Sequence, residues 1–262
     1  MRKIFPLAFI VMGCLLAVKS VCAQTTTDPV AQAASVIEAA IKARGGDRYL
    51  SFKTLTAEGQ YTHFDRGLST VPTPFLDVIM WPDKERVEFG KGKKKDRRIQ
   101  ANVATNGWVY DGDTETLKDQ NEPQRREFLD GLEVDVDHIL KGGWKAAGAR
   151  ARYSGREELR PGERADVIEV QLTSDRKVYI WFDRQTHLPL SVNYESANDQ
   201  GLSKNEYRFA QYIAYDGVQF PNIVDFYRDG VQVSRVNYQN IRLDLPVDES
   251  IFAKPANSKS IK

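Results

Sequence analysis

The residues of this chain best suited to metal binding or proton transfer are its three histidines, His63, His138 and His187. Neutral imidazole is a common zinc ligand, but a zinc site needs further ligands at short, fixed spacings. Each histidine stands far from the other two and has no second ligand at such a spacing. The sequence therefore predicts surface or hydrogen-bonded histidines, no metal site and no cofactor.

The acidic residues could also bind a metal ion or transfer protons. Asp111, Asp113 and Glu115 alternate like the beginning of a calcium-binding loop, yet Thr116 occupies the position where that loop requires glycine. No nucleophile elbow, phosphate-binding loop or dinucleotide-binding glycine motif occurs. A carboxylate pair could still meet in space among the 36 acidic residues, but spacing singles out none. We expect no catalytic residue, and a hydrolase is the weakest interpretation.

The beginning of the chain has the layout of a secretory signal peptide. Two basic residues precede an apolar run over residues 4–18, and small residues follow it. The run is shorter than the roughly 20 residues that a membrane-spanning helix needs, so we expect cleavage after Ala23 and export to the periplasm. Both cysteines, Cys14 and Cys22, lie inside this signal, and lipidation of Cys14 is left open.

The amino-acid composition limits the classes of partner that the mature protein can attract. The formal net charge is +1, from 37 basic and 36 acidic side chains, so no overall field attracts nucleic acid. Without the signal peptide, residues 1–23, the chain runs over residues 24–262. A β-rich chain of this length can bury one substantial core, and we expect a single domain and a monomer.

The second half of the chain alternates apolar segments with tight turns. Asp216-Gly217 and Asp229-Gly230 are strong hairpin signals, because Asp-Gly readily adopts the positive φ values of a type I′ turn. Strand-like segments cover residues 53–64, 73–81, 85–89, 150–153, 166–173, 177–182, 188–194, 205–214, 218–227 and 231–243. Roughly a dozen strands exceed the usual number in one open sheet and favour a curved, partly closed antiparallel sheet.

Two segments have helical spacing. A helix over residues 29–44 follows the N-cap Asp28 and ends at Gly45 and Gly46. Residues 122–141 predict two short helices that begin after the cap Asn121. The first helix is rich in alanine and has few large side chains to hold it against a sheet, so we expect either a cover or a mobile lid.

Several strands carry apolar residues on one face only, which indicates that one face of the sheet is buried. The apolar positions are Ile168, Val170, Leu172, Val178, Ile180, Phe182, Leu188, Leu190 and Val192. An ordinary packed core is the simplest account of them. Two short helical segments can cover only part of a sheet with so many strands. This favours a hollow that the side chains of the protein leave unfilled.

Three segments resemble the LolA-like outer-membrane lipoprotein-sorting family. They are residues 183–190 (Asp-Arg-Gln-Thr-His-Leu-Pro-Leu), residues 215–221 (Tyr-Asp-Gly-Val-Gln-Phe-Pro) and residues 245–248 (Leu-Pro-Val-Asp). The end of the first helix, Ala-Arg-Gly-Gly over residues 43–46, is similar too. The resemblance implies a mainly β fold in which a curved antiparallel sheet forms an unclosed half-barrel, covered by two short helical segments.

The resemblance and the one-faced strands together predict a non-enzymatic periplasmic carrier. It would bind the acyl chains of a lipid or lipoprotein in an apolar groove, for lipoprotein sorting at the outer membrane or for lipid transport. The strand residues named above would line the groove, and the first helix would move on release. The helical residues expected to close the groove are Ile37, Ile41, Leu132, Val136 and Ile139. The alternative is an envelope sensor or scaffold on the same fold, which signals to a membrane or envelope protein partner.

Overall fold

One curved antiparallel sheet dominates the molecule. The computed structural model describes residues 28–198 and 201–261, and the expected signal peptide lies outside them. The strands are β1 (Thr54–Asp65), β2 (Leu68–Ser69), β3 (Thr73–Met80), β4 (Lys84–Phe89), β5 (Arg98–Val103), β6 (Asn106–Asp111), β7 (Thr116–Asp119), β8 (Arg150–Arg160), β9 (Glu163–Gln171), β10 (Lys177–Asp183), β11 (Pro189–Asn198), β12 (Gly201–Tyr215), β13 (Val218–Arg228) and β14 (Val231–Leu243).

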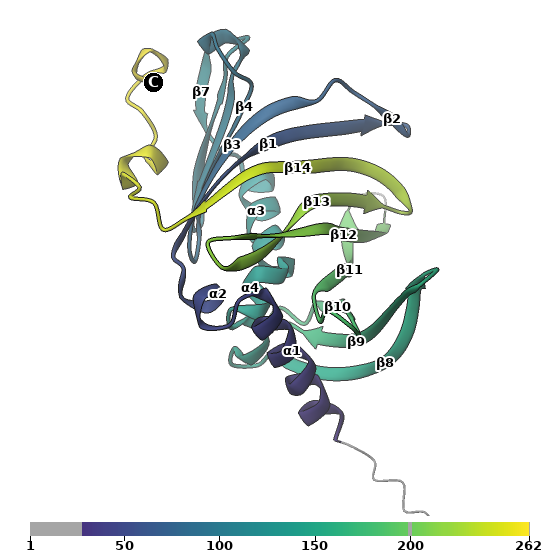
Figure 1. The fold of residues 1–262 in the computed structure, drawn as a ribbon. Coiled ribbons are helices and arrows are strands. Elements are labelled where there is room, and N and C mark those ends of the chain that lie inside the picture. Colours follow the sequence, from purple (N-terminus) through teal and green to yellow (C-terminus); the bar gives the residue numbers. More distant parts are fainter. Residues whose placement is uncertain (1–27, 199–200, 262) are drawn as a thin grey trace, which may run out of the picture.

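All of these strands belong to one 14-stranded sheet, and its order is β7-β6-β5-β4-β3-β1-β14-β13-β12-β11-β10-β9-β8, with β2 paired to β1. Figure 1 shows how the sheet curls from β7 to β8, and these two end strands do not pair with each other in the described chain. The predicted fold class, a mainly β and unclosed curved sheet, is confirmed.

The helices are α1 (Pro29–Arg44), α2 (Asp47–Ser51), α3 (Glu122–Val134) and α4 (Val136–Leu140). The predicted caps are confirmed, because Asp28 accepts a hydrogen bond from the Val30 amide and Asn121 forms a capping box with Gln124. Single 3-10 turns cover Lys94–Asp96, Gly143–Lys145, Glu249–Phe252 and Ser258–Ser260. Among the described residues, no helix combines the length and apolar character that crossing a membrane requires.

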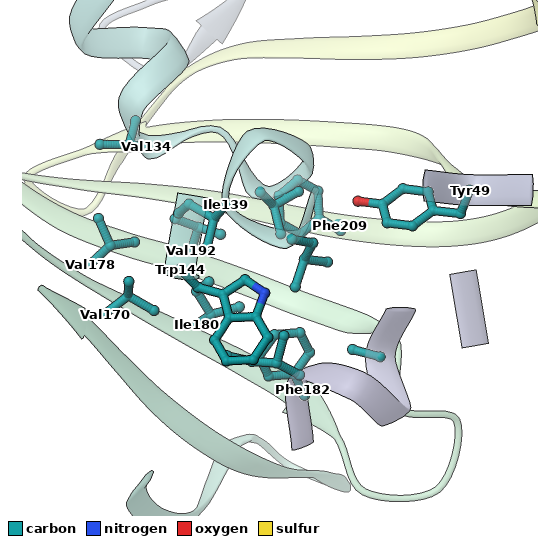
Figure 2. Packing of buried hydrophobic residues seen from close by; sticks show 14 of the residues in the cluster. Tyr49, Val134, Ile139, Trp144, Val170, Val178, Ile180, Phe182, Val192 and Phe209 are labelled. Atoms are coloured by element: carbon teal, nitrogen blue, oxygen red, sulfur yellow. The ribbon is translucent and has the colours of Figure 1, made fainter. Parts of the chain in front are cut away.

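Helix α1 fills one end of the curved sheet. It packs against β8 and also contacts β9 and β13. Ala33, Ile37 and Ala40 point inward and are completely buried, because small side chains let the helix axis approach the strands closely. Figure 2 shows Trp144 among the strand side chains beneath, including Ile180 and Phe182. This end of the molecule is therefore an ordinary packed core.

The convex face of the sheet near β5 and β6 has its own cover. The Trp108 indole donates a hydrogen bond to the carbonyl oxygen of Phe252 (2.8 Å), and Ile261 is buried against Ile99 and Tyr110. The C-terminal segment after β14 therefore runs back along this face, as the yellow trace in Figure 1 shows. This segment buries the apolar residues on one face of β5 and β6. The other face of these two strands therefore belongs to the concave side of the sheet.

The packed end predicts a clear stability difference between two isoleucines. Ile180→Ala leaves a cavity at a completely buried position and should lower the free energy of unfolding by about 2–5 kcal/mol. Ile213→Ala, at a position that is 43% exposed, should lower it by less than about 1 kcal/mol. Urea unfolding followed by circular dichroism measures both, and equal losses would contradict the packed end described here.

Candidate functional site

A cavity of about 520 Å³ lies between α3–α4 and the concave face of the sheet. This volume is within the range of roughly 300–1,000 Å³ that is typical of small-molecule sites. Its walls come from β1, β3, β4, β5 and β11–β14 on one side and from the two helices on the other. Figure 1 shows α3 and α4 inside the curve of the sheet.

Most of the cavity wall is apolar. The apolar lining residues from the strands are Leu55, Ile79, Val192, Phe209, Phe220, Val224, Val236 and Ile241. The helices add Phe128, Leu132, Val134 and Val136. These side chains come from elements far apart in the sequence, and the curl of the sheet brings them to one space. The arrangement can hold a hydrocarbon chain away from water.

The cavity lies away from most of the residues that the sequence predicts for a ligand groove. Of the predicted lining residues, only Leu132, Val136 and Val192 line the cavity. The others near the sheet belong to the packed end beneath α1; they are Ile37, Ile41, Ile139, Ile168, Val170, Leu172, Val178, Ile180 and Phe182. Their one-faced pattern is real, but α1 and Trp144 occupy the space that they face. Helix α1 lines the cavity only through its last residue, Arg44.

Leu188 and Leu190 fall outside both the cavity and the packed end, although the sequence predicts them in the groove. A β-bulge between β10 and β11 is the reason, because it places Pro189 opposite Phe182. Leu188 precedes the strand and Leu190 is skipped in the pairing, so both stay half-buried. A bulge shifts the alternation by one residue, and regular spacing cannot reveal it.

Arg44, at the end of α1, is the completely buried cation of the cavity wall. Its Nη2 lies 2.8 Å from Oδ1 of Asp137 on α4, and its Nε donates to the carbonyl oxygen of Gln219 on β13 (2.6 Å). The guanidinium also lies over the Tyr49 and Phe220 rings, at 4.7 and 5.2 Å from their centroids. One side chain therefore joins α1, α2, α4 and β13.

Helix α4 has two further ties to this cluster. The Tyr49 hydroxyl donates to Oδ1 of Asp137 (2.7 Å), and burial, with the Asp137 charge, raises the pKa of Tyr49. At the end of α4, Lys141 donates to the carbonyl oxygen of Phe52 (2.8 Å), and its Nζ lies 3.4 Å from the Phe52 ring centroid. Burial lowers the pKa of Lys141 to about 8. Helix α4 is thus anchored at both of its ends.

The cavity becomes polar toward β4 and β5. Glu85 and Gln100 line it, and the Asn102 side chain donates to Oε2 of Glu85 (2.9 Å) and accepts from Gln120 (2.7 Å). Behind Glu85 lies Asp77 on β3, which is only 8% exposed. Burial raises the pKa of both carboxyls, and the Glu85 charge raises that of Asp77 further. Among the described residues, no group of three or more potential ligands is placed to hold a metal ion.

The sequence contains a signal for this polar end that periodicity alone overlooks. Asp77 interrupts the apolar strand Phe-Leu-Asp-Val-Ile-Met over residues 75–80, at a position facing the same side as Ile79. A carboxylate at an inward position is rarely fully buried unless it is paired, so it marks a site worth testing. Its partner Glu85 is on the next strand, diagonally across from it.

Several solved structures have the same fold as this chain. No protein-family model matches the chain, and no curated protein matches it. A DUF1329 family protein from Desulfovibrio piger superposes with a TM-score of 0.61 and 14% identity, over 86% of this chain and 98% of that one. A LolA superfamily protein from Nitrosomonas europaea gives a TM-score of 0.56 and 15% identity, over 85% of this chain and 97% of that one.

A third solved structure, an outer membrane lipoprotein-sorting protein domain from Vibrio parahaemolyticus, also gives a TM-score of 0.56, with 14% identity over 85% of this chain and 97% of that one. The chain therefore has a LolA-like fold. The identities are low, so the likeness concerns the path of the backbone, and the side chains of the cavity must be understood from this chain itself.

The Arg44 cluster predicts an unequal response to two substitutions. Asp137→Ala leaves the Arg44 charge buried without its ion-pair partner and should lower the free energy of unfolding by about 3–5 kcal/mol. Glu38→Ala removes the exposed Glu38–Lys145 pair (3.9 Å) and should change it by less than about 1 kcal/mol. Urea unfolding measures both variants, and a small loss for Asp137→Ala would show that the cluster does not hold α4.

Proposed function

We propose that this protein is a non-enzymatic carrier that binds the acyl chain of a lipid or lipoprotein in the cavity beneath α3 and α4. The observation that carries the proposal is the apolar space of about 520 Å³ that the side chains of the protein leave unfilled. The LolA-like fold supports it. The expected signal peptide, residues 1–23, supports a periplasmic location and a role in lipoprotein sorting or lipid transport.

The energetics favour a hydrocarbon occupant. Burying an acyl chain contributes about 0.8 kcal/mol per methylene, so a chain of about 16 carbons gains roughly 12 kcal/mol when it is fully buried. Such a chain needs a long apolar wall and little specific hydrogen bonding. Phe209, Val224, Val236 and Ile241 supply that wall from three neighbouring strands.

Helix α3 is the part of the cover best suited to move. Val134 is its only buried residue, and Leu129 is 38% exposed. Its link to the sheet is polar: Arg176, after β9, lies 3.2 Å from Asp130 and 3.1 Å from Glu133. Because partly exposed ion pairs contribute little stability, α3 can lift while α4 stays anchored.

A sensor or scaffold on the same fold is the second candidate, in which the cavity detects a lipidated ligand and the protein then engages an envelope partner. The two candidates differ in what crosslinking in cells would capture. A carrier transfers its ligand and makes only brief protein contacts, whereas a scaffold yields a stable protein adduct without lipid transfer.

The carrier proposal is tested by extracting gently purified protein with organic solvent and analysing the extract by mass spectrometry. We expect amphiphiles that co-purify with the folded protein and are absent from a heat-denatured, washed control. A fluorescent fatty acid should also bind and be displaced by unlabelled acyl chains. An empty extract together with no binding of the probe would overturn the proposal.

Gly131 on α3 allows the cavity to be filled from the cover. It lines the cavity, and a Cβ added there meets no atom within 4 Å. Gly131→Trp should weaken fatty-acid binding at least about ten-fold, because an indole placed there takes up ligand space. The matched control Gly131→Ala should keep the affinity and raise helix stability by about 1 kcal/mol. Equal affinities for the two variants, in a fluorescence titration, would place the ligand elsewhere.

A further inference from the structure

At its polar end the cavity is lined by the carboxyl of Glu85, and the carboxyl of Asp77 lies behind it. In the part of the chain that the structure describes, neither Asp77 nor Glu85 takes part in an ion pair. Asp77 is 92% buried, as its 8% exposure implies, and its Oδ1 has no hydrogen-bond partner among the described residues. A buried carboxyl oxygen without a hydrogen-bond partner is costly, so its retention points to an external donor.

The strand register places Asp77 on the cavity side. Asp77 pairs with Ala57, and Ala57 pairs with the cavity-lining Ile241. On its own strand, Asp77 alternates with Ile79, which also lines the cavity and pairs with Glu85. Since directly paired residues of an antiparallel sheet share a face, Asp77 lies on the concave face directly behind Glu85, which lines the cavity.

The two cations of the cavity wall, Arg44 and Lys84, already have partners. Arg44 pairs with Asp137, and Lys84 reaches out to Glu249 in the C-terminal segment. The further acidic lining residues are Glu127, which is exposed on α3, and Asp135, which caps α4 through the His138 amide. The lining therefore has more acidic side chains than cations, and Asp77 adds a buried carboxyl behind Glu85.

We propose that the amphiphile held in this cavity has a head group with a protonated amine, and that Asp77 and Glu85 bind this ammonium while the apolar wall holds the hydrocarbon chain. This inference rests on the proposed function and adds the chemistry of the head group. An ammonium supplies the missing positive charge and donates hydrogen bonds to both carboxylates. The face of the Tyr238 ring, also in the lining, adds a cation–π contact.

Other occupants fit these residues less well. A hard metal ion prefers six or more oxygen ligands, and this end offers two carboxylates and the amide oxygens of Gln100 and Asn102, one of which already accepts from Gln120. An anionic head group would meet like charge at close range. Burial raises the pKa of both carboxyls, and the Glu85 charge raises the pKa of Asp77 further, as expected for acids that have lost water and lack a counter-charge.

Three probes of equal chain length test the head group, namely dodecylamine, dodecanol and dodecanoate. Each is titrated into the purified mature chain against a bound fluorescent fatty alcohol. We expect dodecylamine to bind at least about ten-fold more tightly than dodecanol, and dodecanoate to bind most weakly, because each charge-assisted hydrogen bond adds to the affinity. An amine that binds no more tightly than the alcohol overturns the inference and leaves the carrier proposal intact. Failure of all three probes to bind overturns both.

The double variant Asp77→Asn, Glu85→Gln identifies the carboxylates responsible. It should reduce the preference for the amine to about two-fold or less while the affinity for dodecanol stays unchanged, because shape is kept and charge is removed. The matched control Glu58→Gln removes an exposed carboxylate of β1 that does not line the cavity and should keep the preference. A preference that survives in the double variant overturns the assignment. If circular dichroism shows that the double variant does not fold, the relative affinities of the three probes for the unmutated chain decide whether the inference holds.

Discussion

The buried guanidinium of Arg44 is the interaction on which the division of this molecule depends. Desolvating a cation completely is expensive, and the cost is offset only by an anion and aligned acceptors in fixed places. Asp137 and the Gln219 carbonyl oxygen supply both, and they belong to a helix and a strand far apart in the chain. Arg44 therefore fixes where α1 ends and where α4 sits.

The two ends differ in how the same sheet is covered. Beneath α1, alanines bring the helix close to the strands, and Trp144 completes a dense core. Beneath α3, the cover faces outward with many charged residues and contributes little buried area. A dense core stabilises the fold, and the thin cover leaves room, so one half of the molecule supplies the stability that the open half lacks. This arrangement makes an unfilled cavity compatible with a stable protein.

Much of the fold could be predicted because its determinants are local. Asp28 and Asn121 cap helices through their nearest neighbours, and Asp-Gly turns define hairpins within a few residues. The position of the cavity could not be predicted, because it depends on which half of the sheet α1 occupies. The face carrying Val170, Val178 and Ile180 looks the same in sequence whether a helix or a ligand covers it. The packing of elements that are far apart in the chain decides which of the two covers the face, and the alternation of apolar residues contains no information about that packing.

In the proposed carrier, the direction of ligand entry would follow from how α3 and α4 are held. Helix α4 is tied by Asp137 near its beginning and followed by Lys141, which is seated on the Phe52 ring, so lifting it would expose Arg44 as well as the cavity. Helix α3 has no comparable buried tie, and its polar links to Arg176 exchange readily for water. An opening at α3 exposes the apolar wall without disturbing the ion pair that organises the fold. In the proposed carrier, an acyl chain that enters there with its head group toward Glu85 would lie along the concave face from β3 toward β12, and no strand of the sheet would have to separate for it to leave.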